Sequence, residues 1–160
     1  MWAIAYGMAE RAADAGLGIT VHAGEFSPAN LTAALQVPGL CRLGHAVYAV
    51  AETRLLEQLV ERNVTVECSL SCNVVLGAVP SYEKHPIRQF VTSGVAVTLN
   101  TDNPVRIWTT IGREYAIAAA LGFSPSDLLK FTRNAIQASF TSTERRRTLM
   151  DEVRDWEVSW

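Results

Sequence analysis

The chain has 160 residues, of which 49% are hydrophobic and 19% charged, and its formal net charge is -2. This apolar fraction suffices for one ordinary soluble domain and excludes an intrinsically disordered chain. No apolar stretch reaches the roughly 18 to 20 residues of a membrane span, and residues 1–7 lack the basic flank of a signal peptide. The slight acidity excludes the basic footprint of a nucleic-acid-binding protein. We therefore expect a cytoplasmic protein with neither a membrane nor a nucleic-acid partner.

Apolar side chains recur at helical spacing over residues 1–15, which predicts an amphipathic helix that ends before Gly16. Residues 17–22 then alternate between apolar and polar side chains, the period of a strand. The same helix–strand unit recurs three times. The expected helices cover residues 30–37, 51–62 and 85–93, and the strands that follow them cover residues 40–45, 64–69 and 95–102. Further helices are expected over residues 110–121, 125–140 and 143–156.

Strands that alternate with helices at this spacing predict parallel pairing through right-handed crossovers, and therefore an α/β fold. No flexible linker or internal repeat divides the chain. We expect a single domain over residues 1–160, with residues 141–160 as a terminal helical segment.

One side of each predicted strand is polar, whereas a buried parallel strand is normally apolar throughout. These polar side chains are Thr20, His22, His45, Thr65, Glu67, Ser69, Thr98, Asn100 and Asp102. A sheet with helices on one side and a polar lumen on the other is typical of a (β/α) barrel. Sites in such barrels lie at the carboxyl ends of the strands, so we expect a ligand site there.

Three of these strands end in side chains that can bind a metal ion. His22 ends the first strand, and Glu25 follows it in the next turn; His45 ends the second strand and Asp102 the fourth. Imidazole and carboxylate are ligands that zinc accepts, and a nearby Glu can shuttle protons. Each group alone also fits simple turn or capping chemistry. Their expected convergence on one rim favours a metal site.

The remaining polar candidates have structural explanations. Cys41, Cys68 and Cys72 are odd in number and lack a C-x-x-C spacing, which predicts reduced thiols and no structural zinc site. His85 precedes a helix start, and we place it at the rim opposite the site as a capping or packing residue. Glu67 is expected to be paired with a polar neighbour or to lie near the ligand.

Seven short motifs, in this order and spacing, resemble the carboxyl-terminal half of the adenosine deaminase family. They are TVHAGE (20–25), RLGH (42–45), ECSLSCN (67–73), HPIR (85–88), LNTDNP (99–104), REY (113–115) and NAIQASF (134–140).

The resemblance implies half of a (β/α)8 TIM-type barrel, namely strands five to eight with their helices. It implies hydrolytic deamination of adenosine or a related 6-aminopurine nucleoside through a zinc-activated water, within a complete barrel. By motif, His22 and Asp102 are implied zinc ligands. Glu25 is the implied proton donor to the purine ring, and His45 is implied to orient and help deprotonate the water.

The resemblance also implies that Gly24 and Asn103 bind the substrate. Asn103 stands where the family usually has a second Asp, at a position that contacts purine N7. An Asn amide donates a hydrogen bond at any pH, so this contact can survive the change. Ala46 follows the RLGH motif where the family usually has Gly.

The family's H-x-H pair, two zinc ligands on the first barrel strand, has no counterpart among the three histidines of this chain. The length also agrees with half of a barrel of about 250 residues. Three interpretations stay open: a fragment of a full deaminase, a chain completed by a separate amino-terminal half or by a second copy through its open sheet edges, and a catalytically inactive binding remnant. A deaminase of another purine or of a pterin-like amine is a further alternative.

Overall fold

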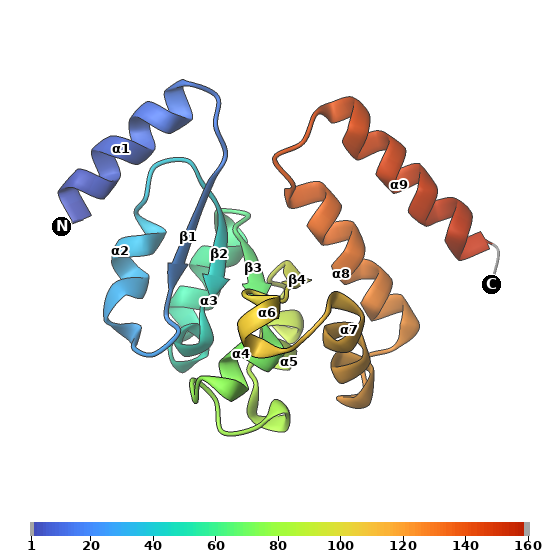
Figure 1. Ribbon diagram of the computed structural model, residues 1–160. Helices are drawn as coiled ribbons and strands as arrows, with labels where there is room; N and C mark the ends of the chain where they lie inside the picture. The colour runs from blue at the N-terminus through green and yellow to red at the C-terminus, as the bar shows by residue number, and fades with distance from the viewer. Residues whose placement is uncertain (1, 159–160) are drawn as a thin grey trace.

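The computed structural model describes residues 2–158, so positions 1, 159 and 160 of the predicted terminal segments lie outside the described residues. Four strands alternate with helices along the chain (Figure 1). The strands are β1 (Ile19–Ala23), β2 (Leu40–His45), β3 (Thr65–Cys68) and β4 (Val97–Leu99). The helices are α1 (Trp2–Asp14), α2 (Leu31–Leu35), α3 (Thr53–Glu61), α4 (Leu70–Val75), α5 (Ile87–Thr92), α6 (Pro104–Ile107), α7 (Ile111–Ala120), α8 (Pro125–Ala138) and α9 (Thr143–Val158).

The four strands form one parallel sheet in the order β1-β2-β3-β4. Each strand therefore lies beside the next one in the chain, as expected for consecutive units of a (β/α) barrel. The expected α/β half barrel is confirmed. Helices α4 and α6 were not predicted; both are short and follow strands β3 and β4 at their carboxyl ends.

The hydrophobic core lies between the sheet and the helices that cover one face of it. Leu43, Val66 and Val97 project from three neighbouring strands and are almost completely buried. They pack in one cluster with Leu59 of α3 and Phe90 of α5. The apolar face expected from strand alternation is thus the face that the helices cover.

The opposite face of the sheet carries a hydrogen-bonded polar cluster. Thr20 of β1 donates to Glu67 Oε2 at 2.9 Å, and Arg42 Nε of β2 lies 2.9 Å from Glu67 Oε1. Register places the three residues on one face of the sheet, because Thr20 pairs with Arg42, and Glu67 pairs with Gly44, two residues beyond Arg42 in β2. The expected pairing of Glu67 with a polar neighbour is confirmed.

Helix α8 and the residues after it connect the two ends of the sheet. Asn134 Nδ2 donates to the carbonyl of Val97 in β4 at 2.9 Å. One turn later, at the last residue of α8, Arg42 Nη1 donates to the carbonyl of Ala138 at 3.0 Å, and its guanidinium lies 3.9 Å from the centre of the Phe140 ring. This NAIQASF segment therefore fixes α8 to both β4 and β2.

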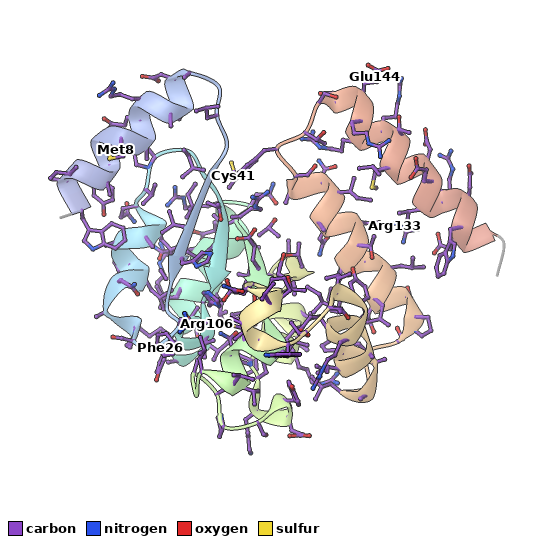
Figure 2. All side chains as sticks on the ribbon, viewed as in Figure 1. Met8, Phe26, Cys41, Arg106, Arg133 and Glu144 are labelled. Carbon is purple, nitrogen blue, oxygen red and sulfur yellow. The ribbon has the colours of Figure 1, made fainter. Side chains whose placement is uncertain are left out.

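Helix α9 runs beside α8 at the end of the chain (Figure 1). Arg133 of α8 lies between the two helices (Figure 2) and forms an ion pair with Glu157 of α9. Among residues 2–158, no helix combines the length and the hydropathy that crossing a bilayer would require.

Asn134→Ala is expected to lower the free energy of unfolding by about 1 to 2 kcal/mol, because the buried Val97 carbonyl loses its side-chain donor. Urea denaturation followed by circular dichroism measures the change. Gln137→Ala, an exposed change on the same helix, is the matched control and should leave stability within about 0.5 kcal/mol. Equal stability of the two variants would contradict this role for Asn134.

Candidate active site

The carboxyl ends of the strands surround a polar pocket of about 320 Å³. In Figure 2, Cys41 marks the amino end of β2, and Phe26 marks the loop after β1, at the carboxyl end of the sheet. The pocket is lined by His22, Gly44, His45, Glu67, Ser69, Asn100, Thr101 and Asp102. The structure thus brings together His22, His45 and Asp102, three residues that the sequence placed at separate strand ends.

Two of these residues reach the pocket through unusual backbone conformations. His45 and Asp102 have φ values of 69° and 55°, in the left-handed region that few non-glycine residues adopt. Strand alternation alone would group His45 with Leu43 on the helix-covered side. The left-handed turn ends this alternation, and the His45 ring lies edge-on to the His22 ring, with centroids 4.7 Å apart.

Small residues beside the two histidines make this arrangement possible. A Cβ atom on Gly44 would lie 2.4 Å from Cδ2 of His22, so only glycine leaves room for the ring. Ala46, which stands where the family usually has Gly, is completely buried and has a φ of 52°. The replacement of Gly by Ala at this position therefore affects the backbone conformation of the turn after β2.

A buried amide connects the acid and base candidates. Asn73 of α4 donates through Nδ2 to Glu25 Oε1 at 3.2 Å and lies 3.1 Å from His45 Nδ1. Glu25 Oε2 lies 3.6 Å from His45 Nε2. Burial lowers the pKa of His45, and the nearby Glu25 carboxylate partly opposes this effect. The strand ends thus present an imidazole and a carboxyl group held by one shared donor.

His85 lies on the site side of the sheet, so the expected position at the opposite rim is wrong. A helix that follows a parallel strand runs back along it, and its first residues therefore lie at the carboxyl end of the sheet. His85 Nε2 is 3.1 Å from Asn73 Oδ1, while His85 Nδ1 accepts from the backbone N–H of Ile87 at 3.1 Å. The expected capping contact is present, and a link to the site accompanies it.

Cys72 is a neighbour of Asp102 that sequence reasoning did not connect to the site. Its Sγ donates to Asp102 Oδ2 at 2.8 Å. Burial, followed by this contact, raises the pKa of Cys72 to about 12, and burial also raises the pKa of Cys68. Neither cysteine is in a disulfide, nor is the exposed Cys41. The thiol of Cys72 is therefore a hydrogen-bond donor rather than a nucleophile.

The implied substrate residues lie in loops beside the pocket and are not part of its lining. Gly24 has a φ of 68°, and its N–H donates to Asn30 Oδ1 at 3.0 Å. Asn103 begins α6, and its Oδ1 accepts from the N–H of Arg106 at 3.0 Å. Since the oxygen is engaged, the Nδ2 group is the part of Asn103 available to a ligand.

The donor set matches zinc in chemistry but is incomplete in number. Imidazole nitrogen and carboxylate oxygen are both zinc ligands, and protein zinc sites use three or four of them. Across residues 2–158, no group of three or more His, Cys, Asp or Glu side chains is placed to hold a metal ion. His22 and Asp102 alone therefore provide part of such a site.

A parallel half barrel with imidazole and carboxylate groups at the carboxyl ends of its strands is the arrangement of a (β/α) barrel enzyme, in which these ends form the site. The family model described as adenosine deaminase matches residues 3–156, and the chain belongs to the adenosine deaminase family.

Relatives show how much of the fold is present. An adenine deaminase of Rhizobium leguminosarum bv. trifolii is 39% identical over 141 residues, which cover 87% of this chain and 44% of the relative. An adenosine deaminase of Yersinia enterocolitica is 37% identical, over 91% of this chain and 44% of the relative. The crystal structure of an adenine deaminase from Arthrobacter aurescens matches with a TM-score of 0.86 and 31% identity, over 94% of this chain and 47% of that one. The chain thus spans less than half the length of these relatives.

Stability is expected to fall on mild acidification because of His85. Burial, followed by the charge of His45, lowers the pKa of His85 from 6.5 to about 4. Between these values the unfolded chain binds a proton that the folded chain does not, so stability decreases as the pH drops. From pH 7 to pH 5, the titration of His85 is expected to lower the free energy of unfolding by about 2 kcal/mol.

Urea denaturation at the two pH values measures this dependence. His85→Gln should lose less stability on acidification than the wild type, whereas Gln89→Ala, an exposed change on α5, should behave as the wild type. An unchanged pH dependence in His85→Gln would show that His85 is not the titrating group.

Proposed function

We propose that the chain forms the carboxyl-terminal half of a zinc-dependent hydrolase that deaminates adenosine or a related 6-aminopurine nucleoside. The observation that carries this proposal is the pocket at the strand ends, which His22, His45 and Asp102 line together. Family membership supports hydrolytic deamination as the reaction class. The cysteines without disulfides support a reducing compartment such as the cytoplasm.

His22 and Asp102 would hold the zinc ion together with ligands from outside this chain. When bound, zinc lowers the pKa of a coordinated water to about 7 and so provides a nucleophile at neutral pH. The remaining ligands would come from an amino-terminal half or, through the open edges of β1 and β4, from a second copy.

Glu25 would supply the proton that makes the purine electrophilic. Its Oε1 accepts from Asn73, which leaves Oε2 to carry the proton donated to ring N1. Protonation of N1 makes C6 electrophilic; the water oxygen then bonds to C6, and the C6–N6 bond breaks. One of the water's protons leaves in ammonia, and the other restores Glu25.

His45 and Asn103 would orient the reactants. His45 lines the pocket beside His22 and is placed to hold the attacking oxygen. The free Nδ2 group of Asn103 would donate to N7 of the purine, an acceptor at every pH in the working range. Adenine itself is the second candidate substrate, favoured by the similarity to adenine deaminases.

The isolated chain is expected to bind zinc weakly and not to deaminate adenosine, because two donors do not complete a zinc site. Competition with a chromophoric chelator measures the affinity, and loss of adenosine absorbance measures turnover. Tight binding of one zinc ion that His22→Gln abolishes would show that the chain holds a complete site by itself.

A chimera tests the reaction: this chain replaces the matching segment of the Rhizobium adenine deaminase, and adenosine and adenine are assayed separately. Glu25→Gln is expected to lower kcat by about 10² to 10⁴, the usual contribution of a general acid. The matched control is Glu10→Gln, at an exposed carboxylate on α1. Full activity in Glu25→Gln would contradict the proposed acid.

A further inference from the structure

The hydrogen-bond direction at His85 is fixed by the backbone. The N–H of Ile87 can only donate, and it points to His85 Nδ1 at 3.1 Å. Nδ1 is therefore the acceptor of this ring, and in the neutral imidazole the proton must lie on Nε2. Because Nε2 lies 3.1 Å from Asn73 Oδ1, His85 donates to the amide oxygen.

Glu25 fixes the same amide from its other end. Oε1 of Glu25 accepts whether or not Oε2 carries a proton, and it faces the Nδ2 group of Asn73 at 3.2 Å. The reversed amide would place its oxygen against this carboxylate and its NH₂ group against the N–H of His85. Two independent neighbours thus select one orientation of Asn73.

This orientation determines the proton position on His45. The NH₂ group of Asn73 has two hydrogens, of which one goes to Glu25 and the other to His45 Nδ1 at 3.1 Å. His45 Nδ1 must therefore accept, and the neutral ring carries its proton on Nε2. Asn73, His85 and His45 are all buried, with exposed fractions of 0%, 5% and 2%, so no bulk solvent competes for these contacts.

We propose that Asn73 and His85 are positioning residues that hold His45 in the Nε2–H tautomer and fix the Glu25 carboxyl group. The inference rests on the proposed function for its catalytic meaning. In this tautomer, neutral His45 orients the attacking oxygen by donating a hydrogen bond from Nε2. It does not accept the water's proton at Nε2, in contrast to the role that the family resemblance implies.

The tautomers can be measured directly on the full chain by ¹⁵N NMR of the imidazole rings, because protonated and unprotonated ring nitrogens resonate far apart. His22→Gln and His85→Gln assign the three rings by removal of one signal set at a time. If the chain self-associates, the same shifts are measured in the solid state. We expect an unprotonated Nδ1 and a protonated Nε2 in both His45 and His85 near neutral pH.

Variants of Asn73 and His85 give a second readout. Asn73→Asp replaces the amide donor by an acceptor and should move the proton of His45 to Nδ1, or add one there. His85→Leu should leave the Asn73 amide unanchored and produce a mixture of His45 tautomers, whereas His85→Gln, which can still donate to Asn73 Oδ1, should retain the wild-type His45 shifts.

A protonated Nδ1 on His45 in the wild-type chain would overturn the proposal, and so would unchanged His45 shifts in folded Asn73→Asp. In the chimera, His85→Leu should lower kcat more than it changes KM, and His85→Gln should restore kcat. The NMR readout does not require turnover. An inactive chimera would therefore count against the proposed function, while the tautomer measurement would still show whether Asn73 and His85 position His45.

Discussion

The site depends on a buried carboxyl group that belongs to a distant helix. Glu114 of α7 is completely buried, and it accepts from the backbone N–H of Ser71 at 3.1 Å and from the hydroxyl of Thr109 at 2.6 Å. Each intramolecular hydrogen bond contributes roughly 0.5 to 1.5 kcal/mol, and a buried donor left without its partner costs more. Ser71 lies in the first turn of α4, and this short helix carries both Cys72 and Asn73. The contacts to Asp102, Glu25 and His45 therefore all depend on where Glu114 holds α4.

The overall fold could be predicted from the sequence because it follows from periodicity. Four strands and the longer helices appear near their expected positions, since alternating and helical apolar patterns are encoded locally. Helix α4 has no such signal: it contains Ser, Cys and Asn, which favour helices weakly, and its first turn is satisfied by a residue more than 40 positions later. A contact of that range leaves no trace in a local pattern.

The candidate site could be predicted only in outline. Strand-end position and motif identified His22, His45 and Asp102, and the structure places them around one pocket. Their side-chain directions could not be read from alternation, because left-handed turns at His45 and Asp102 determine them. Sequence reasoning did not single out Asn73 and placed His85 at the opposite rim, because the hydrogen bonds of both residues have partners in three separate segments. The ECSLSCN and HPIR motifs contain both residues, but a motif does not reveal the direction of a hydrogen bond.

The segment after α8 has a mechanical consequence for an open sheet. A Cβ atom on Gly18 would lie 2.1 Å from the Phe140 ring, so this ring sits directly against the chain just before β1, while its helix is attached to β4. Residues 134–140 thus cross the sheet from β4 to the residue before β1, and Arg42 of β2 contacts them on the way. Because these contacts fix the distance between the two edge strands, they oppose flattening of the sheet. The four strands can in this way keep the curvature of a closed barrel, and the rim geometry that the pocket requires, through contacts made entirely within this half.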